Sequence, residues 1–310
     1  MNAPRVVSLL SSATEIVCEL GCIDRLVGRS HECDHPAGIL KLPVCTGPKF
    51  DTAGTSKEID TRVKETLAAS PEEALSVYAV DAELLRSLQP DVILTQSQCE
   101  VCAVSLKDVE RAVCTWISSE TQLVALEPHC LADVWDDIRA VAGALNVQED
   151  GERLIERLQS DLRSVEARVA SFVPPTVACI EWIDPLMTAG NWTPELIQIA
   201  GGENLFGKAG SHSPWMSWED LRRADPDVIV VAPCGFDLER TRRESGTLAE
   251  QPGWSGLSAV KNRRVHIADG NRFFNRPGPG LIETTQILTE MFHPGVIESG
   301  LHGTAWERLR

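Results

Sequence analysis

Short uninterrupted apolar runs recur along the chain, and amphipathic segments separate them. Two of the runs share one sequence context, because Pro90-Asp91-Val92-Ile93 is repeated downstream as Pro226-Asp227-Val228-Ile229. Each run follows a short amphipathic segment, at residues 82–88 in one case and 218–223 in the other, so each predicts a helix followed by a strand. Runs of Val, Ile and Leu are typical of strands covered on both faces of a parallel sheet. The pattern therefore predicts two similar α/β halves.

The remaining strands and helices follow from the same two periodicities. Strands are predicted at residues 6–10, 25–29, 42–45, 91–95, 122–126, 176–180, 227–231 and 264–268. Helices are predicted at residues 56–69, 106–113, 131–145, 148–172, 194–200, 238–248 and 281–292. A further helix ends at Leu20, and Ser12 and Glu15 have the spacing of a capping box at its start. Helices that alternate with strands indicate an α/β fold of two doubly wound lobes.

The segment at residues 148–172 is long enough to join the two lobes. Its apolar residues fall on one helical stripe, formed by Leu154, Leu158, Leu162, Val165 and Val169. Pro174 and Pro175 end the pattern. We therefore assign residues 1–128 to an N-terminal lobe, 129–173 to a helical connection and 174–310 to a C-terminal lobe, with a ligand cleft between the lobes. Because a helix is stiffer than a hinge of paired strands, we expect the two lobes to move little relative to each other, rather than to close over the ligand by a large rotation.

Composition and charge narrow the class of partner. The chain has 310 residues and 43% hydrophobic content, which suffices for a sizeable core, and its formal net charge is −16. Such an acidic chain is poorly suited to nucleic acid or to an anionic membrane, because phosphate binding needs clustered Lys and Arg. We therefore expect a small-molecule ligand, no nucleic-acid partner and a monomer.

Three features of the sequence predict a cytoplasmic location. The first ten residues contain neither the long apolar segment nor the cleavage site of a secretory signal. No apolar run approaches the length of a transmembrane helix. The 10 cysteines are irregularly spaced, which is typical of free thiols in a reducing compartment and not of a disulfide framework.

Several thiols and one imidazole follow predicted strands. Because ligands bind beyond the carboxyl ends of parallel strands, we expect these side chains at one sheet edge in each lobe. They are His31, Cys33, Cys99, Cys102 and Cys234. Thiolate and imidazole bind zinc, iron or cobalt, so one hypothesis is a zinc or iron–sulfur site made of these residues. The alternatives are small thiols that line a pocket, a single axial ligand to a metal held in a macrocycle, and a redox dithiol at Cys99 and Cys102.

The same loops carry aromatic and polar side chains suited to a pocket for a metal chelate. The aromatic candidates are Trp182, Trp192, Trp215, Phe236, Phe273 and Phe274. The polar candidates are Glu32, Gln98, Glu100, Glu181, Asn275 and Arg276. An apolar pocket with a few placed polar groups is typical of a ligand site. The alternatives are that the aromatic residues belong to the core and that Arg276 braces the Pro-Gly turn after it.

An enzyme is the alternative from another class. Glu100 and Glu181 would permit general acid–base work if they faced each other, and a zinc or iron–sulfur site would make the chain a metalloprotein or metalloenzyme. The sequence contains no nucleophile with its base at a recognisable spacing, no phosphate loop and no dinucleotide fingerprint. We therefore favour a binding protein.

Longer motifs extend this interpretation over nearly the whole chain. They are SLLSSATEIVCELGCIDRLVGRS at residues 8–30, the two DVI strands, the long linking helix and WTPELIQIAGGENLF at residues 192–206. Together they resemble the cobalamin- and iron-chelate-binding proteins of ABC importers, which have the class III periplasmic-binding-protein fold. The chain is most similar to a cytoplasmic-looking cobalamin-binding subgroup, through SHECD at 30–34, QCEVCAVS at 98–105, EWIDP at 181–185, PCGFD at 233–237 and FNRPGP at 274–279.

The resemblance implies a ligand and a partner. The ligand would be cobalamin, another corrinoid or a related metal chelate, held between the two lobes. The partner would be the permease of an ABC importer, whereas the missing export signal favours storage, sensing or hand-off of the ligand inside the cell.

Overall fold

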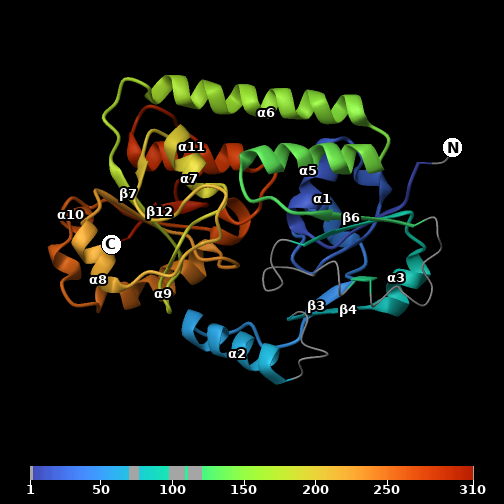
Figure 1. Ribbon diagram of the computed structural model, residues 1–310, viewed down its shortest axis with the longest axis horizontal. Coiled ribbons are helices and arrows are strands. Elements are labelled where there is room, and N and C mark those ends of the chain that lie inside the picture. The colour runs from blue at the N-terminus through green and yellow to red at the C-terminus, as the bar shows by residue number, and fades with distance from the viewer. Residues whose placement is uncertain (1–2, 70–76, 98–108, 111–120, 310) are drawn as a thin grey trace. The chain divides into compact units, whose positions relative to one another are not determined.

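The computed structural model describes residues 3–69, 77–97, 109–110 and 121–309. The chain forms two compact units, each with its own sheet (Figure 1). The N-terminal unit comprises Met1–Gly54, Glu58–Pro128 and Ala132–Glu156. The C-terminal unit comprises Thr55–Lys57, His129–Leu131 and Arg157–Arg310.

The N-terminal unit is built on a four-stranded parallel sheet with the strand order β2-β1-β5-β6. Its strands are β1 (Val6–Ser8), β2 (Leu26–Arg29), β5 (Val92–Gln96) and β6 (Gln122–Leu126). β1 and β5 are buried along their whole length, as expected of apolar runs that are covered on both faces. A separate antiparallel pair joins β3 (Thr46–Pro48) to β4 (Tyr78–Val80).

Helices cover this sheet on both faces. On one face α3 (Ala82–Leu88) packs its leucines against Val7 and Ile93 of the sheet. Figure 1 shows α1 (Ser11–Glu19) and α5 (Leu131–Ala144) on the other side. The helix α2 (Ser56–Ala69) begins with residues of the C-terminal unit and continues in the N-terminal unit. Among the described residues, short 3₁₀ turns lie at Ile23–Arg25, Ala37–Lys41 and Trp254–Gly256.

The C-terminal unit has a six-stranded mixed sheet. Its main strand order is β12-β11-β10-β7-β8, and β9 pairs with the start of β7. The strands are β7 (Thr176–Trp182), β8 (Met187–Thr188), β9 (Glu203–Asn204), β10 (Val228–Val231), β11 (Val265–Ala268) and β12 (Trp306–Arg308). β7, β10 and β11 are parallel, whereas β8 and β12 run antiparallel to their neighbours.

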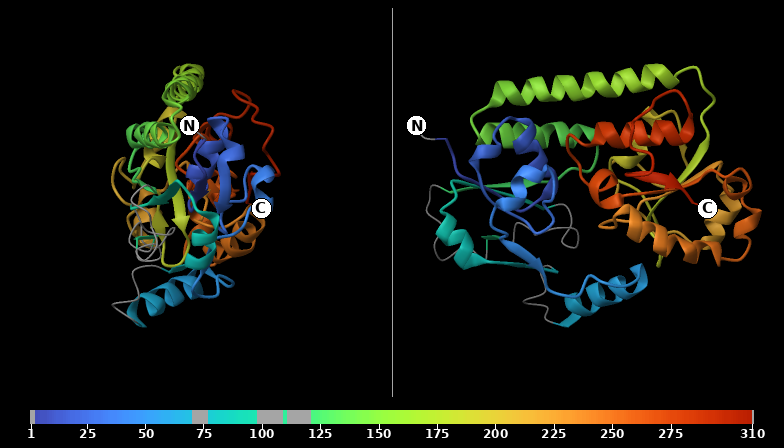
Figure 2. Two further views of the ribbon diagram at one scale, coloured as in Figure 1. Left: turned by 90° about the vertical axis from the view of Figure 1, so that its right-hand side faces the viewer. Right: turned by 180° about the vertical axis from the view of Figure 1, so that it is seen from behind.

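Helices also lie on both faces of this second sheet, as Figures 1 and 2 show. One face carries α8 (Trp218–Ala224), α9 (Leu238–Ala249) and α10 (Ser258–Lys261). The other face carries α7 (Thr193–Ile199) and α11 (Leu281–Phe292). Leu221 of α8 and Leu238 of α9 share one buried cluster with Ile229 of β10. The result is the three-layer arrangement that alternating helices and strands predict.

The repeated Pro-Asp-Val-Ile sequence forms the same structure in both units. α3 and α8 each end in a residue with left-handed backbone, Gln89 (φ 42°, ψ 62°) and Asp225 (φ 42°, ψ 63°). Asp91 then accepts a hydrogen bond from the backbone N–H just before β1 (2.7 Å), and Asp227 accepts one from the first N–H of β7 (2.9 Å). In each unit the repeated carboxylate therefore helps to fix the register of the strand beside it.

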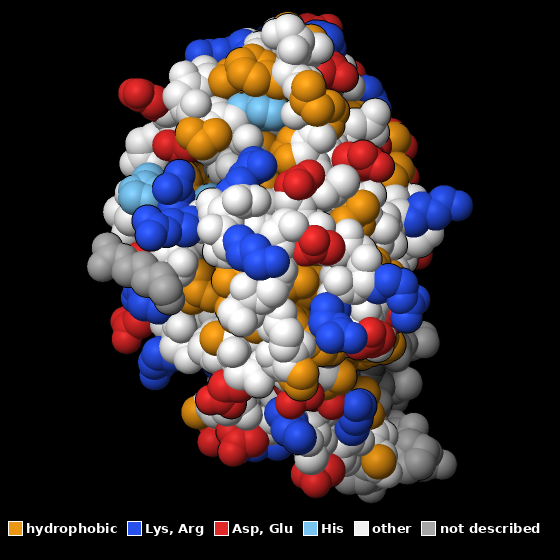
Figure 3. Space-filling view, turned by 90° about the vertical axis from the view of Figure 1, so that its left-hand side faces the viewer, with side chains coloured by type: hydrophobic (Ala, Val, Ile, Leu, Met, Phe, Trp, Pro, Cys, Tyr) orange, Lys and Arg blue, Asp and Glu red, His pale blue; other side chains and the backbone are white. Residues whose placement is uncertain are grey.

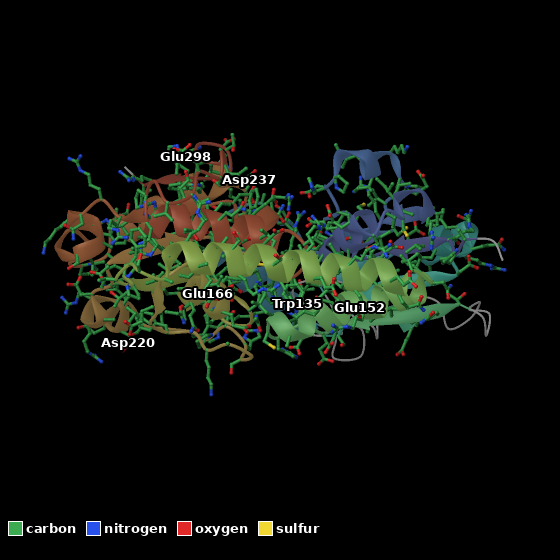
Figure 4. All side chains as sticks on the ribbon, turned by 90° about the horizontal axis from the view of Figure 1, so that it is seen from above. Trp135, Glu152, Glu166, Asp220, Asp237 and Glu298 are labelled. Atoms are coloured by element: carbon green, nitrogen blue, oxygen red, sulfur yellow. The ribbon has the colours of Figure 1, made fainter. Side chains whose placement is uncertain are left out.

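The long helix predicted at residues 148–172 is present as α6 (Gln148–Val169). Figure 4 shows it as one continuous helix, with Glu152 and Glu166 at separate points along it. Its apolar stripe is buried, as the periodicity predicts, because no side chain of the stripe is more than 5% exposed.

Two local predictions differ from the structure. Ser12 does not cap α1, because the helix begins two residues earlier than the capping-box spacing requires and its N-cap position is Leu10. The strand predicted at residues 42–45 forms instead as β3, because its partner is β4, a strand that the sequence pattern did not reveal. Of the helix predicted at residues 106–113, only residues 109–110 are described, and both are helical.

Candidate ligand-binding site

A polar cluster follows β2 in the N-terminal unit. β2 leads directly into Ser30, His31 and Glu32, and the short β3–β4 pair brings Thr46 and Tyr78 to the same place. The His31 Nδ1 lies 2.8 Å from the Thr46 Oγ1, and the ring centroids of His31 and Tyr78 are 5.3 Å apart. These contacts fix the imidazole on the turn after β2.

The environment of His31 favours the uncharged imidazole. The side chain is 24% exposed, and its Nε2 lies 3.9 Å from the Glu32 Oε1, which is too long for a hydrogen bond. Burial, followed by the positive charge of Arg29, lowers the pKa of His31. The ring is therefore neutral at neutral pH, which is the form that binds metal ions.

Glu32 is a fixed hydrogen-bond acceptor beside His31. The Tyr78 hydroxyl donates to its Oε1 at 3.1 Å, and the side chain is 35% exposed. The Ser11 hydroxyl at the start of α1 donates to the backbone oxygen of Glu32 at 2.8 Å. These two contacts fix the position of Glu32 on the turn after β2.

Cys33 belongs to the core of the N-terminal unit. It is 0% exposed, and the Thr14 hydroxyl donates to its sulfur at 3.1 Å. An enclosed thiol of this kind is not accessible to a ligand. The sequence placed Cys33 among both the ligand-binding and the metal-ligating residues, and the burial argues against both roles.

Four predicted site residues lie outside the described residues: Gln98, Cys99, Glu100 and Cys102. The hypotheses about them stay predictions. Within residues 3–69, 77–97, 109–110 and 121–309, no group of three His, Cys, Asp or Glu side chains is placed to hold a metal ion. The structure therefore gives no support to a zinc or iron–sulfur site that includes His31, Cys33 and Cys234.

The end of β7 presents a second fixed carboxylate, in the C-terminal unit. The Ser213 hydroxyl donates to the Glu181 Oε2 at 2.9 Å and accepts from the Gly190 N–H at 3.0 Å. Ser213 is only 3% exposed, so the rest of the unit fixes its position. The Cys234 N–H donates to the backbone oxygen of Glu181 at 3.1 Å, which joins the loop after β10 to the end of β7.

An aromatic pair stands beside Glu181. The ring centroids of Trp182 and Phe236 are 5.4 Å apart, and the planes are tilted by 59°. The guanidinium carbon of Arg240 lies 3.9 Å from the centroid of the Phe236 ring, which is a cation–π contact. Phe236 is 1% exposed, whereas Trp182 is partly exposed, so Phe236 supports the indole that a ligand can reach.

Most of the remaining predicted site residues stabilise the π-helical turn Gly270–Phe274. The Trp192 Nε1 donates to the Phe274 backbone oxygen at 3.2 Å, and the Asn275 side chain donates to the Gly270 oxygen at 2.8 Å. They are also enclosed, with exposed fractions of 6% for Trp192, 8% for Phe273, 3% for Phe274 and 4% for Arg276. These residues therefore shape the loop after β11 and offer little surface to a ligand.

An open pocket of about 580 Å³ lies beside the edge strand β8. It is lined by Thr188, Phe206, Pro214, Trp215, Met216, Asp220, Arg223 and Ala224. Trp215 is 59% exposed and pairs with Met187 across a short bridge that continues the sheet beyond β8. The sequence named Trp215 but not its pocket, because β8 and β9 are two residues long and no periodicity reveals strands of that length.

Sequence reasoning did not nominate three residues that hold candidate side chains in place. Tyr78 contacts Glu32, Ser213 contacts Glu181, and Arg240 contacts Phe236. Arg240 lies four residues after Phe236 at the start of α9, and this spacing is a usable signal. Tyr78 is the only tyrosine of the chain, but nothing in the sequence joins it to Glu32, 46 positions away. Ser213 gave no signal.

Phosphate binding would need Lys and Arg side chains clustered on the surface. Figure 3 shows one face, on which acidic side chains stand among the Lys and Arg side chains. A continuous basic surface does not form on this face. None of the described helices is both long and apolar enough to cross a membrane.

Sequence comparison shows relatives over almost the full length. A family model described as periplasmic binding protein matches residues 6–271. The ABC transporter substrate-binding lipoprotein YvrC of Bacillus subtilis is 24% identical over 299 residues, which is 94% of this chain and 80% of that protein. The vitamin B12-binding protein of Yersinia pestis is 23% identical over 292 residues, or 93% of this chain and 86% of that protein.

Solved structures show the same architecture. The periplasmic vitamin B12 binding protein BtuF of Vibrio cholerae has a TM-score of 0.64 at 20% identity, covering 93% of this chain and 96% of that one. A periplasmic heme binding protein of Pseudomonas aeruginosa has a TM-score of 0.69 at 20% identity, covering 95% and 94%. The predicted two-lobe α/β fold is therefore confirmed, and the chain belongs to the periplasmic binding protein family.

Proposed function

We propose that this chain is a ligand-binding protein of the kind that serves an ABC importer, and that its ligand is a corrinoid such as cobalamin. Family membership and the Bacillus subtilis substrate-binding lipoprotein support the first part. The relatives named vitamin B12-binding protein support the corrinoid, whereas other similar structures are of heme-binding proteins. The choice between the two chelates rests on the residues of the site.

The observation that carries the corrinoid is a pair of fixed carboxylates, one in each unit. A hydroxyl group holds each of them: Tyr78 holds Glu32, and Ser213 holds Glu181. The corrin ring carries carboxamide side chains, whose N–H groups donate hydrogen bonds to a carboxylate. Haem carries carboxylates, which a glutamate repels. Glu32 and Glu181 therefore favour a chelate with an amide rim.

Two arginines beside candidate aromatic residues of the C-terminal unit do not reverse this preference. Arg272 forms an ion pair with Glu283 at 3.2 Å, and its guanidinium also lies 5.0 Å from the Phe273 ring centroid. Arg240 lies over Phe236, and burial lowers the pKa of Arg240 although Glu244 and Asp237 are negative charges near it. These two guanidinium groups thus already have acidic or aromatic neighbours.

Two further residues fit a corrinoid. Trp182 offers a partly exposed indole, supported by Phe236, for contact with a flat macrocycle. His31 offers a neutral imidazole that is suited to be an axial donor to cobalt. Cys33 does not compete for this role because it is buried.

We also propose that the protein shares the fold and the ligand of importer binding proteins but acts inside the cell. The cysteines Cys18, Cys22, Cys33, Cys45, Cys130, Cys179 and Cys234 are free thiols, which is typical of a reducing compartment. Cell fractionation with an antibody to the native protein tests this, and recovery in the envelope fraction would contradict it.

Metal retention tests the ligand. Reduced, purified protein is incubated with hydroxocobalamin or with haemin, passed through gel filtration and analysed for cobalt, iron and zinc. We expect one cobalt per chain and weaker retention of haemin. Tighter binding of haemin than of cobalamin, or retained zinc or iron with no cobalt gained, would exclude the corrinoid.

A charge-removing variant tests the role of the carboxylate. Glu181→Gln should weaken cobalamin binding about tenfold, because the variant loses a charge-assisted hydrogen bond to the carboxamide groups of the corrin ring. It should weaken haemin binding less, because haemin has no such amide donors. Glu298→Gln is the matched control, since Glu298 is an exposed carboxylate on the segment that follows α11. Equal losses for both chelates would contradict the proposed discrimination.

A further inference from the structure

The start of α2 belongs to the C-terminal unit although the residues on both sides of it belong to the N-terminal unit. The chain leaves the N-terminal unit after Gly54, contributes Thr55–Lys57 to the C-terminal unit and returns with Glu58. Residues 51–55 and 57–58 are all exposed, whereas Ser56 is 0% exposed. Ser56 is therefore the buried residue of this three-residue segment.

Two hydrogen bonds and an ion pair hold the segment. The Ser56 N–H donates to the Glu244 Oε1 at 2.5 Å, and the Ser56 hydroxyl accepts from the Asp184 N–H at 3.0 Å. Glu244 is 8% exposed, so its bond to the first amide of a helix is formed away from water and is charge-assisted. The Lys57 ammonium lies 3.7 Å from the Asp184 carboxylate, but both side chains are exposed, so this pair adds little.

The partners of Ser56 come from the two elements that carry the aromatic pair. Asp184 lies two residues after Trp182, on the loop that leaves β7. Glu244 lies one helical turn after Arg240, whose guanidinium covers the ring of Phe236. Because Trp182 and Phe236 touch each other, both attachment points of Ser56 are linked to the surface proposed to hold the ligand.

We propose that Thr55–Lys57 is a strap that fastens beside the aromatic pair and slows ligand exchange. With the strap attached, Ser56 joins the loop after Trp182 to the middle of α9, and the indole of Trp182 stays in place on Phe236. With the strap released, Glu244 and the Asp184 N–H lose their partner, and the support of the indole loosens. The part of this proposal that concerns the ligand rests on the proposed function, whereas attachment of the strap does not.

The variant Ser56→Pro tests the strap. It removes both the N–H and the hydroxyl, and proline is well tolerated at the first position of a helix, so α2 itself should persist. Glu244→Gln is a second variant, which keeps the shape of the acceptor and removes its charge. Ser258→Pro is the matched control: Ser258 is the first residue of α10, and Asp225 binds its N–H and its hydroxyl at 2.7 Å each.

Two readouts separate the strap from the ligand assignment. In protein without ligand, amide hydrogen exchange in the Thr55–Lys57 segment should be at least about tenfold faster in Glu244→Gln than in wild type or Ser258→Pro. In protein loaded with hydroxocobalamin, Ser56→Pro and Glu244→Gln should release cobalamin about tenfold faster, and Ser258→Pro at the wild-type rate.

The outcomes are distinguishable. If wild type binds no cobalamin, the proposed function fails, and the exchange experiment still decides whether the strap is attached. If cobalamin binds and both strap variants release it at the wild-type rate, the strap has no role in exchange of the ligand. Exchange at residues 55–57 that is as fast in wild type as in Glu244→Gln would overturn the attachment itself.

Discussion

At the scale of single residues, His266 is enclosed without a polar partner. It is 2% exposed, neither ring nitrogen has a hydrogen-bond partner in the described part of the chain, and Trp306 packs against its edge with centroids 5.4 Å apart. Burial, followed by Arg308, Arg264 and His302, lowers the pKa of His266 to about 3. The folded state therefore excludes a proton that the unfolded chain accepts below pH 6.5.

The lower pKa of His266 in the folded state than in the unfolded state predicts that the free energy of unfolding falls in acid. The contribution of His266 is fully present above pH 6.5 and is lost as the pH falls toward 3, and from pH 7 to pH 5 the loss is about 2 kcal/mol. His266→Leu removes the titration, so wild type should lose about 2 kcal/mol more than the variant over that range. Urea unfolding of both proteins at pH 7 and pH 5 measures it. A difference between the two proteins that does not change with pH would refute the assignment.

Asp137 on α5 predicts a dependence of the opposite sign. It is 8% exposed, its Oδ1 accepts a 3.3 Å bond from the Glu127 N–H, and its Oδ2 has no partner among the described residues. Burial raises the pKa of Asp137 to about 7, with further increases from Asp133, Asp136 and Glu127. The folded state keeps a proton that the unfolded chain has released, so this carboxyl costs stability as the pH rises toward and through 7.

The variant Asp137→Asn isolates the effect. Asparagine keeps the acceptor for the Glu127 N–H and cannot ionise, so the variant should gain about 2.5 kcal/mol on wild type between pH 5 and pH 8. Unfolding by urea at the two pH values provides the comparison. If wild type and variant respond equally to pH, Asp137 is not the group that titrates.

The site residues show which contacts a sequence can predict. Glu32, Glu181 and Trp182 were nominated because each follows a strand, and a strand end is visible in the apolar pattern. Their partners Tyr78 and Ser213 are 46 and 32 positions away along the chain, so only the folded sheet brings them together. The burial of Cys33 was equally invisible in the sequence, because the Thr14 hydroxyl that donates to its sulfur comes from α1.

At the scale of elements, the π-helical turn after β11 requires glycine at its start. A Cβ on Gly270 would lie 2.2 Å from the Pro233 carbonyl oxygen and 2.6 Å from the Ala232 carbonyl oxygen, both at the end of β10. The turn thus packs directly on the backbone of the loop that carries Cys234 and Phe236. Since these atoms are backbone, a side chain cannot be accommodated without moving one of the two loops.

Gly270→Ala should therefore separate the two loops. We expect a loss of about 2–3 kcal/mol in the free energy of unfolding and weaker binding of the ligand. Gly246→Ala in α9 is the control, because a Cβ there meets no atom within 4 Å and alanine favours a helix by up to about 1 kcal/mol. Thermal unfolding of the two variants gives the comparison, and equal stability would show that the contact is not as tight as described.

The elements that the sequence did not predict are among the shortest ones. The helices α2, α3 and α11 lie at the predicted residues, and β6 does too, because each spans enough residues for a period to appear. The strands β8, β9 and β12 were not predicted, since they have two or three residues and owe their extended form to a neighbouring strand. The π-helical turn has no sequence period of its own, and it was expected to be a loop.

At the scale of the whole molecule, the two-lobe architecture was predictable from repetition. The Pro-Asp-Val-Ile sequence occurs twice, and in both units its aspartate binds the backbone at the start of the neighbouring strand. The division of the chain between the units was not predictable at the start of α2. The buried residue of Thr55–Lys57 is Ser56, and one residue leaves no pattern in the sequence.

Short segments of the C-terminal unit lie within the sequence of the N-terminal unit, and this order limits how the gene can be divided. Neither unit is one continuous stretch, because Thr55–Lys57 and His129–Leu131 lie in the C-terminal unit while their flanking residues do not. Glu244 binds the first of these segments and Glu195 the second, in each case at a backbone N–H that opens a helix. No single break in the gene yields both halves complete. The halves share the repeated Pro-Asp-Val-Ile sequence, yet separating them would require a cut on each side of both short segments.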